Sequence, residues 1–258
     1  MSKSKAVPSS LQIYQTLNFD EFELIESNRP IDWKKVERMR VEIRRKNLSS
    51  SYIVLCNSKS ASKRRYGCSG KKYGVVDGQH RFLAYKLEEV KMFYQINDSV
   101  TLDDIPRAAA QQDSWKLTDF LHHYCVRGFG EYKAFKGYMV RNKFPAATTL
   151  VILCGDRSTY ARRKFINGEL EVRTNWTIAN DFAEAVHQFS KLIKFARQSR
   201  FIEAYYIMFK NKEYDHSRMM ARMEYMAGSM KRQSDTKLHL EQLEYVYNYK
   251  SREKVQFS

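Results

Sequence analysis

Short runs of apolar residues dominate the first hundred positions of the chain. They are rich in aliphatic and aromatic side chains, and each is only four to seven residues long, as is typical of strands. A helical spacing lies between two of these runs, where Val36, Met39 and Ile43 stand three and four residues apart. This spacing predicts a helix from Asp32 to about Asn47 with Asp32 as its N-cap. We expect one or two strands within 11–25, and one strand each at 52–55, 73–76 and 91–96.

After residue 104 the spacing of apolar positions becomes helical and stays so to the end of the chain. Gly155 follows one apolar run directly and is its natural C-cap. Strands early and helices late predict an α+β fold, in which a small mixed domain precedes an all-helical region. Helices are expected at 115–124, 132–141, 146–154 and 158–166, with about three more between 177 and 249.

Charge adds a first indication of function. The 258 residues include 45 Lys and Arg against 29 Asp and Glu, a net charge of +16. Such a surplus favours a polyanionic partner, with nucleic acid ahead of a membrane surface. The four cysteines form no Cys-x-x-Cys pair, so neither a zinc ribbon nor a disulfide framework is expected. We expect a cytoplasmic protein, because 1–10 is polar and no apolar stretch approaches the roughly 20 residues that span a bilayer.

The segment Asp77-Gly78-Gln79-His80-Arg81 joins a predicted strand to a predicted helix. Glycine allows a ligand to approach the backbone closely, and the start of a helix offers unpaired amide groups and a favourable dipole. Arg81 adds a planar guanidinium suited to phosphate. These features predict a phosphate-binding corner. The alternative is a structural turn in which Arg81 bridges an acidic partner.

The same segment resembles the central box of the ParB/sulfiredoxin superfamily, in which a strand leads into Gly-x-x-Arg-x-x-Ala, here Gly78, Arg81 and Ala84. Asn28-Arg29-Pro30 and the helix that follows occupy the positions expected upstream. Downstream, 146–170 is similar to the helix-turn-helix of ParB proteins. The resemblance covers about two-thirds of the chain. The box is also similar to that of DndB-like proteins of DNA phosphorothioation systems.

The resemblance implies a DNA-binding protein of phage or plasmid type that is switched by a nucleotide, CTP or ATP with Mg²⁺. It also implies a homodimer on double-stranded DNA, because helix-turn-helix proteins commonly bind as two-fold dimers. The resemblance implies a ParB-like domain at 1–108 and a helix-turn-helix domain at 109–175. The helical C-terminal domain at 176–258 lies outside the resemblance, and we expect it to serve dimerisation. The residues implied to bind nucleotide are Gly78, Gln79, His80, Arg81, Gln111 and Gln112. The basic residues implied to contact DNA are Lys143, Arg157, Arg162, Arg163 and Lys164.

The chain departs from the family at three places. Phe82 stands where a second Arg usually follows the first, and Gln111-Gln112 with Trp115 replaces a box that normally holds Glu-Asn and an Arg. Sulfiredoxins carry their catalytic cysteine where this chain has Gln79. The sulfinic-acid reductase activity is therefore not expected.

Two other functions are consistent with the sequence. A ParB-like nuclease or NTP-hydrolysing enzyme would use Asp77, His80 and Arg81 as its catalytic residues. Against this, Asp77 is typical of a turn and a lone histidine is often structural. An interaction protein would use the basic surface to bind an acidic protein or RNA. No metal site is expected, because His122, His123 and Cys125 lack a second pair that would complete four ligands.

Overall fold

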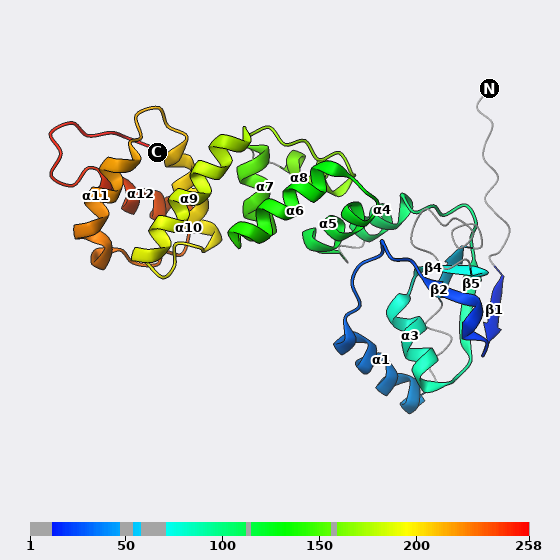
Figure 1. Ribbon diagram of the computed structural model, residues 1–258. Coiled ribbons are helices and arrows are strands. Elements are labelled where there is room, and N and C mark those ends of the chain that lie inside the picture. The colour runs from blue at the N-terminus through cyan, green and yellow to red at the C-terminus, as the bar shows by residue number, and fades with distance from the viewer. Residues whose placement is uncertain (1–11, 47–53, 58–70, 112–114, 156–158, 258) are drawn as a thin grey trace, which may run out of the picture. The chain divides into compact units, whose positions relative to one another are not determined.

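The computed structural model describes residues 12–46, 54–57, 71–111, 115–155 and 159–257. The chain divides into two compact units, Met1–Phe129 and Gly130–Ser258 (Figure 1). The described residues form eleven α-helices and a five-stranded mixed sheet, which confirms the mixed α+β class. The domain boundary predicted at residue 108 lies inside the first unit, and the one predicted at residue 175 lies inside the second.

The first unit is built on the sheet, with strand order β1-β5-β3-β4-β2. β1 pairs antiparallel with β5, β5 parallel with β3, β3 antiparallel with β4, and β4 parallel with β2. β4 is buried along its length until its last residue, as expected of a central strand covered by packing elements. The predicted runs therefore form strands in their described parts, while residues 11, 52 and 53 lie outside the described residues. The strands are β1 (Ile13–Thr16), β2 (Phe22–Leu24), β3 (Val54–Asn57), β4 (Tyr73–Asp77) and β5 (Met92–Ile96).

Helices α1 (Trp33–Lys46) and α3 (Gln79–Glu88) pack against each other, and α3 also contacts β3, β4 and β5. The predicted N-cap of α1 is confirmed, because Asp32 Oδ1 accepts hydrogen bonds from the amides of Lys34 (3.0 Å) and Lys35 (3.2 Å). Two further helices, α4 (Asp104–Gln111) and α5 (Leu117–Val126), follow the sheet in sequence. The core of the unit lies between the sheet and the α1–α3 pair. Its buried side chains include Phe22, Val36, Val54, Val75, Phe82, Tyr85 and Met92.

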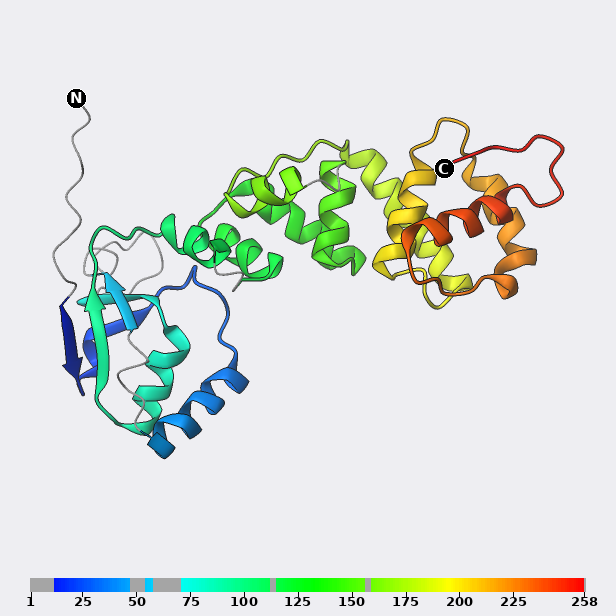
Figure 2. The same ribbon diagram turned by 180° about the vertical axis from the view of Figure 1, so that it is seen from behind.

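The second unit is all-helical (Figure 2). Four helices follow residue 175, rather than the predicted three. The additional break lies at Ile193, which has an extended backbone although no Gly or Pro stands there to mark it in the sequence. An aromatic core that includes Phe182, Phe189 and Tyr205 joins these helices. The helices of the second unit are α6 (Gly130–Asn142), α7 (Ala146–Cys154), α8 (Thr159–Ile166), α9 (Trp176–Leu192), α10 (Ser199–Phe209), α11 (His216–Met226) and α12 (Thr236–Tyr247).

Among the helices in the described part of the chain, none combines the length and the apolarity that a membrane span requires.

Candidate functional site

The candidate site is the corner where β4 leads into α3. Gly78 has a φ of +86°, in the left-handed region that favours glycine, and its carbonyl accepts the first helical bond from the amide of Phe82 at 2.8 Å. A Cβ at this position would lie 3.0 Å from Nε of Arg81 and 3.2 Å from its Cζ. The backbone conformation therefore favours glycine, and any larger residue would push the Arg81 guanidinium away from the turn.

Arg81 turns back over Gly78 to the end of the strand. Its Nη2 donates to Asp77 Oδ2 at 2.8 Å, forming an ion pair across one helical turn. Asp77 has 64% of its side-chain surface exposed, whereas Arg81 has 24%. Because an exposed ion pair contributes little to stability, this contact mainly orients the guanidinium. The structural role considered for Arg81, bridging an acidic partner, is thus present in the fold.

The next two residues of the corner point inward. Gln79 and His80 are 4% and 3% exposed, respectively. Gln79 Nε2 donates to the carbonyl oxygen of Arg29 at 2.6 Å, and His80 Nε2 accepts from the amide of Asp32 at 2.9 Å. Both side chains therefore hold the segment before α1 against the start of α3.

Burial, together with the nearby cations Arg29 and Lys35, lowers the pKa of His80 to about 4. At neutral pH the imidazole is uncharged, and its Nε2 lone pair accepts the Asp32 amide. This geometry favours the structural role for His80 over that of a general base.

The segment that Gln79 and His80 hold is anchored at other points as well. Asn28 Nδ2 donates to the carbonyl oxygen of Val76 in β4 at 3.1 Å. From α5, His122 Nε2 lies 3.1 Å from the carbonyl oxygen of Glu26, and His123 Nδ1 lies 2.8 Å from that of Ser27. Because a carbonyl oxygen only accepts, both histidines donate in these bonds. The two histidines thus fix the backbone that carries Arg29.

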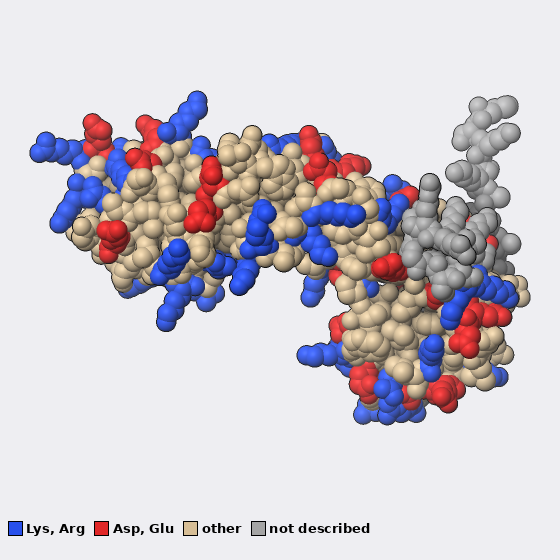
Figure 3. Space-filling model, viewed as in Figure 1, with Lys and Arg blue, Asp and Glu red and all other residues tan. Residues whose placement is uncertain are grey.

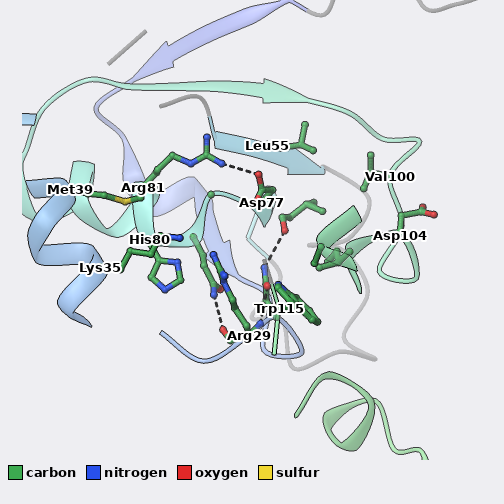
Figure 4. A pocket seen from close by; sticks show the side chains of 16 residues that line it. Arg29, Lys35, Met39, Leu55, Asp77, His80, Arg81, Val100, Asp104 and Trp115 are labelled. Atoms are coloured by element: carbon green, nitrogen blue, oxygen red, sulfur yellow. Dashed lines mark hydrogen bonds and ion pairs between the residues drawn. The ribbon is translucent and has the colours of Figure 1, made fainter. Parts of the chain in front are cut away.

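A cavity of about 520 Å³ opens at this corner (Figure 4). Among the described residues, three cationic side chains line it, namely Arg29, Lys35 and Arg81. Burial lowers the pKa of Lys35, and the charges of Arg29 and Arg81 lower it further, while Asp32 and Asp77 act in the opposite direction. The positive groups therefore lie close enough to repel one another. A bound anion would relieve that repulsion.

The remaining wall of the cavity combines apolar side chains with polar ones, among them the carboxylates of Asp77 and Asp104. It includes Ile105 and Ala109 from α4, and Trp115, whose ring packs against Phe120 at 5.1 Å between centroids. A cavity of this volume, with apolar side chains and a few convergent polar groups, is typical of small-molecule sites. The arrangement can hold a ligand that carries phosphate at one end and a less polar group at the other.

The structure brings Asp77, Gly78, Gln79, His80 and Arg81 together at this cavity. Gln111 ends α4, and its side chain lies outside the described residues, as does all of Gln112.

Sequence reasoning did not identify Arg29 and Lys35 as site residues. Arg29 lies in the upstream box, which was the available signal. Lys35 lies on α1 among several other basic residues, so no signal in the sequence distinguished it from them.

Within the described part of the chain, no three His, Cys, Asp or Glu side chains gather closely enough to hold a metal ion.

The predicted helix-turn-helix corresponds to α7 and α8, which contact each other. α7 is largely buried and ends at Gly155, whose φ of +72° confirms the predicted C-cap. α8 exposes Arg162 and Arg163 on its outer face, and the Arg163 guanidinium lies 5.4 Å from the centroid of the Tyr160 ring. The outer face of α8 therefore offers cationic and aromatic groups to solvent.

The other residues predicted to contact DNA differ in their surroundings. Lys164 Nζ is paired with Glu171 at 3.0 Å, which raises the pKa of the lysine. Lys143 is exposed just after α6, with a φ of +56°. Arg157 lies outside the described residues. Residues 130–258 hold 23 Lys and Arg against 14 Asp and Glu, and Figure 3 shows many of these cationic side chains at the surface of the helices.

No protein-family model, curated protein or solved structure matches this chain.

Proposed function

We propose that this chain is a ParB-like DNA-binding protein whose strand-to-helix corner binds the phosphates of a nucleotide, CTP or ATP, as a switch. The observation that carries the proposal is the cavity of about 520 Å³ in which Arg29, Lys35 and Arg81 meet the start of α3. Phosphate is the ligand that such a combination binds best, because guanidinium groups pair with its oxygens and helix amides donate to them.

The duplex-binding part of the proposal rests on α7 and α8. In a helix-turn-helix, the second helix enters the major groove while Lys and Arg around it contact phosphates. α8 has the exposed Arg162 and Arg163 that such a role requires, and the surplus of positive charge in 130–258 supports a polyanionic partner. Mg²⁺ would accompany the nucleotide triphosphate, and dimerisation remains a prediction.

Calorimetry tests nucleotide binding directly. CTP, ATP, GTP and UTP with Mg²⁺ are titrated into the wild-type chain, Arg81→Ala and Lys86→Ala. Arg81→Ala is expected to weaken binding by about 10- to 100-fold, because a charge-assisted hydrogen bond contributes about 1.5–3 kcal/mol. Lys86→Ala, at an exposed position of the same helix that does not line the cavity, serves as the matched control and keeps wild-type affinity. Absence of saturable binding for all four nucleotides in the wild type would contradict the switch.

The enzymatic alternative is not favoured by the geometry of the corner. A nuclease or NTP-hydrolysing centre at Asp77, His80 and Arg81 needs a base with an available lone pair. The Nε2 lone pair of His80 accepts the Asp32 amide, so His80 does not serve as that base, and Asp77 already pairs through Oδ2 with the guanidinium of Arg81 while its side chain stays largely exposed. The salt dependence of binding distinguishes the proposed DNA-binding protein from an interaction protein. Phosphate contacts on duplex DNA give a steep slope of log K against log[salt].

A further inference from the structure

A second cavity, of about 450 Å³, lies within the second unit between the end of α6 and α9. We call it the α6–α9 groove. Phe144, Ala183 and Val186 supply apolar surface to its lining. The polar side chains that line it are Arg141, Asn142, Asn180, Glu184, His187 and Arg197. It is distinct from the corner at β4 and α3, and none of its residues belongs to the proposed helix-turn-helix.

Both guanidinium groups of the groove are held by neighbouring side chains. Arg141 Nη2 donates to Asn180 Oδ1 at 3.2 Å, and Arg197 Nη2 donates to His187 Nδ1 at 3.1 Å. Each of these bonds uses one of the five N–H groups that a guanidinium carries. Because an arginine only donates, His187 accepts at Nδ1, and a neutral ring carries its proton on Nε2. The groove is therefore lined by oriented N–H donors.

The charge of the lining is positive overall. Two arginines stand against one carboxylate, Glu184, and Lys143 follows Asn142 at an exposed position beside the groove. An anion with several acceptor oxygens complements these groups, whereas a cation would meet two guanidinium groups.

We propose that the α6–α9 groove binds a phosphodiester group of the DNA backbone, with Arg141 and Arg197 as its two cationic contacts. The inference rests on the proposed function, because duplex DNA is the polyanion that the neighbouring helix-turn-helix would place against the same unit. A backbone contact of this kind carries no sequence information and fixes the position of the protein on the duplex.

The test measures duplex binding as a function of salt by fluorescence anisotropy, on the full-length chain. Each phosphate contact adds about one to the slope of log K against log[salt]. Because Arg141 and Arg197 share one phosphate, the double variant Arg141→Ala/Arg197→Ala is expected to lower that slope by about one and to weaken binding equally on different sequences. A control, Arg232→Ala/Lys254→Ala, removes two exposed positive charges of the same unit that do not line the groove, and it keeps the wild-type slope.

Glu184→Gln provides a test of opposite sign. It removes the one carboxylate of the lining without shortening a side chain, so it is expected to tighten duplex binding severalfold at low salt. If the double variant lost affinity only because it misfolded, Glu184→Gln would show no gain in affinity for the duplex.

The outcomes separate the inference from the function on which it rests. Wild-type binding with a steep slope, together with an unchanged slope in Arg141→Ala/Arg197→Ala, overturns the inference and leaves the proposed function intact. Loss of binding to poly-glutamate in the double variant, with duplex binding unchanged, assigns the groove to an acidic protein and also overturns it. If the wild-type chain binds no duplex DNA, the proposed function is overturned, and the inference that rests on it is overturned as well.

Discussion

Gly78 shows how one residue determines the shape of the candidate site. Its φ of +86° lets the chain turn from β4 into α3, and the absence of a Cβ lets the Arg81 guanidinium lie directly over the turn. The conformation and the close approach are separate constraints. Gly128 has a similar φ of +89°, but, its chain neighbours aside, no atom of the described residues lies within 4 Å of the Cβ that a substitution would add there.

This pair of glycines gives a matched prediction. Gly78→Ala and Gly128→Ala are each expected to lower the free energy of unfolding by about 1–2 kcal/mol, because both force a left-handed backbone on alanine. Only Gly78→Ala displaces Arg81 from Asp77 and is expected to weaken nucleotide binding as well. Chemical denaturation and calorimetry measure the two effects. Equal nucleotide affinity in the two variants would contradict the role assigned to the Arg81 contact.

At the scale of elements, the start of α3 is joined to the start of α1 by the hydrogen bond between His80 and the Asp32 amide. The bond requires neutral His80, and burial ensures this by lowering the pKa of the ring to about 4. His123 is buried in the same unit, and burial lowers its pKa to about 4 as well. Both side chains therefore link the stability of the first unit to pH.

The direction of that dependence follows from the two pKa values of His80, about 4 in the folded chain and an ordinary 6.5 when unfolded. Between these values the unfolded chain binds the proton more readily. The stabilisation is therefore complete above about pH 6.5 and is lost as the pH falls toward 4. His80→Gln is expected to reduce the slope of the free energy of unfolding in this range by at most about 1.4 kcal/mol per pH unit. Denaturant titrations at several pH values measure it, and an unchanged slope would show that His80 does not titrate as described.

At the scale of the whole molecule, two units each have their own core, and both carry a positive net charge. The core of the first unit combines sheet and helix residues such as Phe82. The core of the second is aromatic, and the ring of Phe189 packs against Tyr205 at 4.6 Å between centroids and against Phe201 at 5.7 Å. Because these cores share no residues, damage to one is expected to leave the other folded.

Phe189→Ala is expected to destabilise the second unit by about 3–5 kcal/mol, because it leaves a cavity among buried rings. Hydrogen exchange followed by mass spectrometry is then expected to accelerate in 130–258 and to stay unchanged in β4 and α3. Phe82→Ala serves as the reciprocal variant, with faster exchange in the first unit only. Faster exchange throughout the chain in both variants would mean that the two units unfold as one.

The sequence by itself determined the features that depend on neighbouring residues. The helix capped by Asp32, the strand before Gly78 and the helix that ends at Gly155 follow from local spacing, capping and backbone freedom. Gly78 and Arg81 could be identified as site residues for the same reason, because they lie within one turn of each other.

Only the tertiary structure decided how distant residues meet. The sheet order, the break in the helices at Ile193 and the approach of Arg29 and Lys35 to Arg81 depend on packing between segments far apart in the chain. The roles of Gln79 and His80 were decided in the same way, since the partners that accept or donate their hydrogen bonds are backbone groups of Arg29 and Asp32. No local pattern encodes such a partner, because it is the burial of both segments in one core that brings the two groups together.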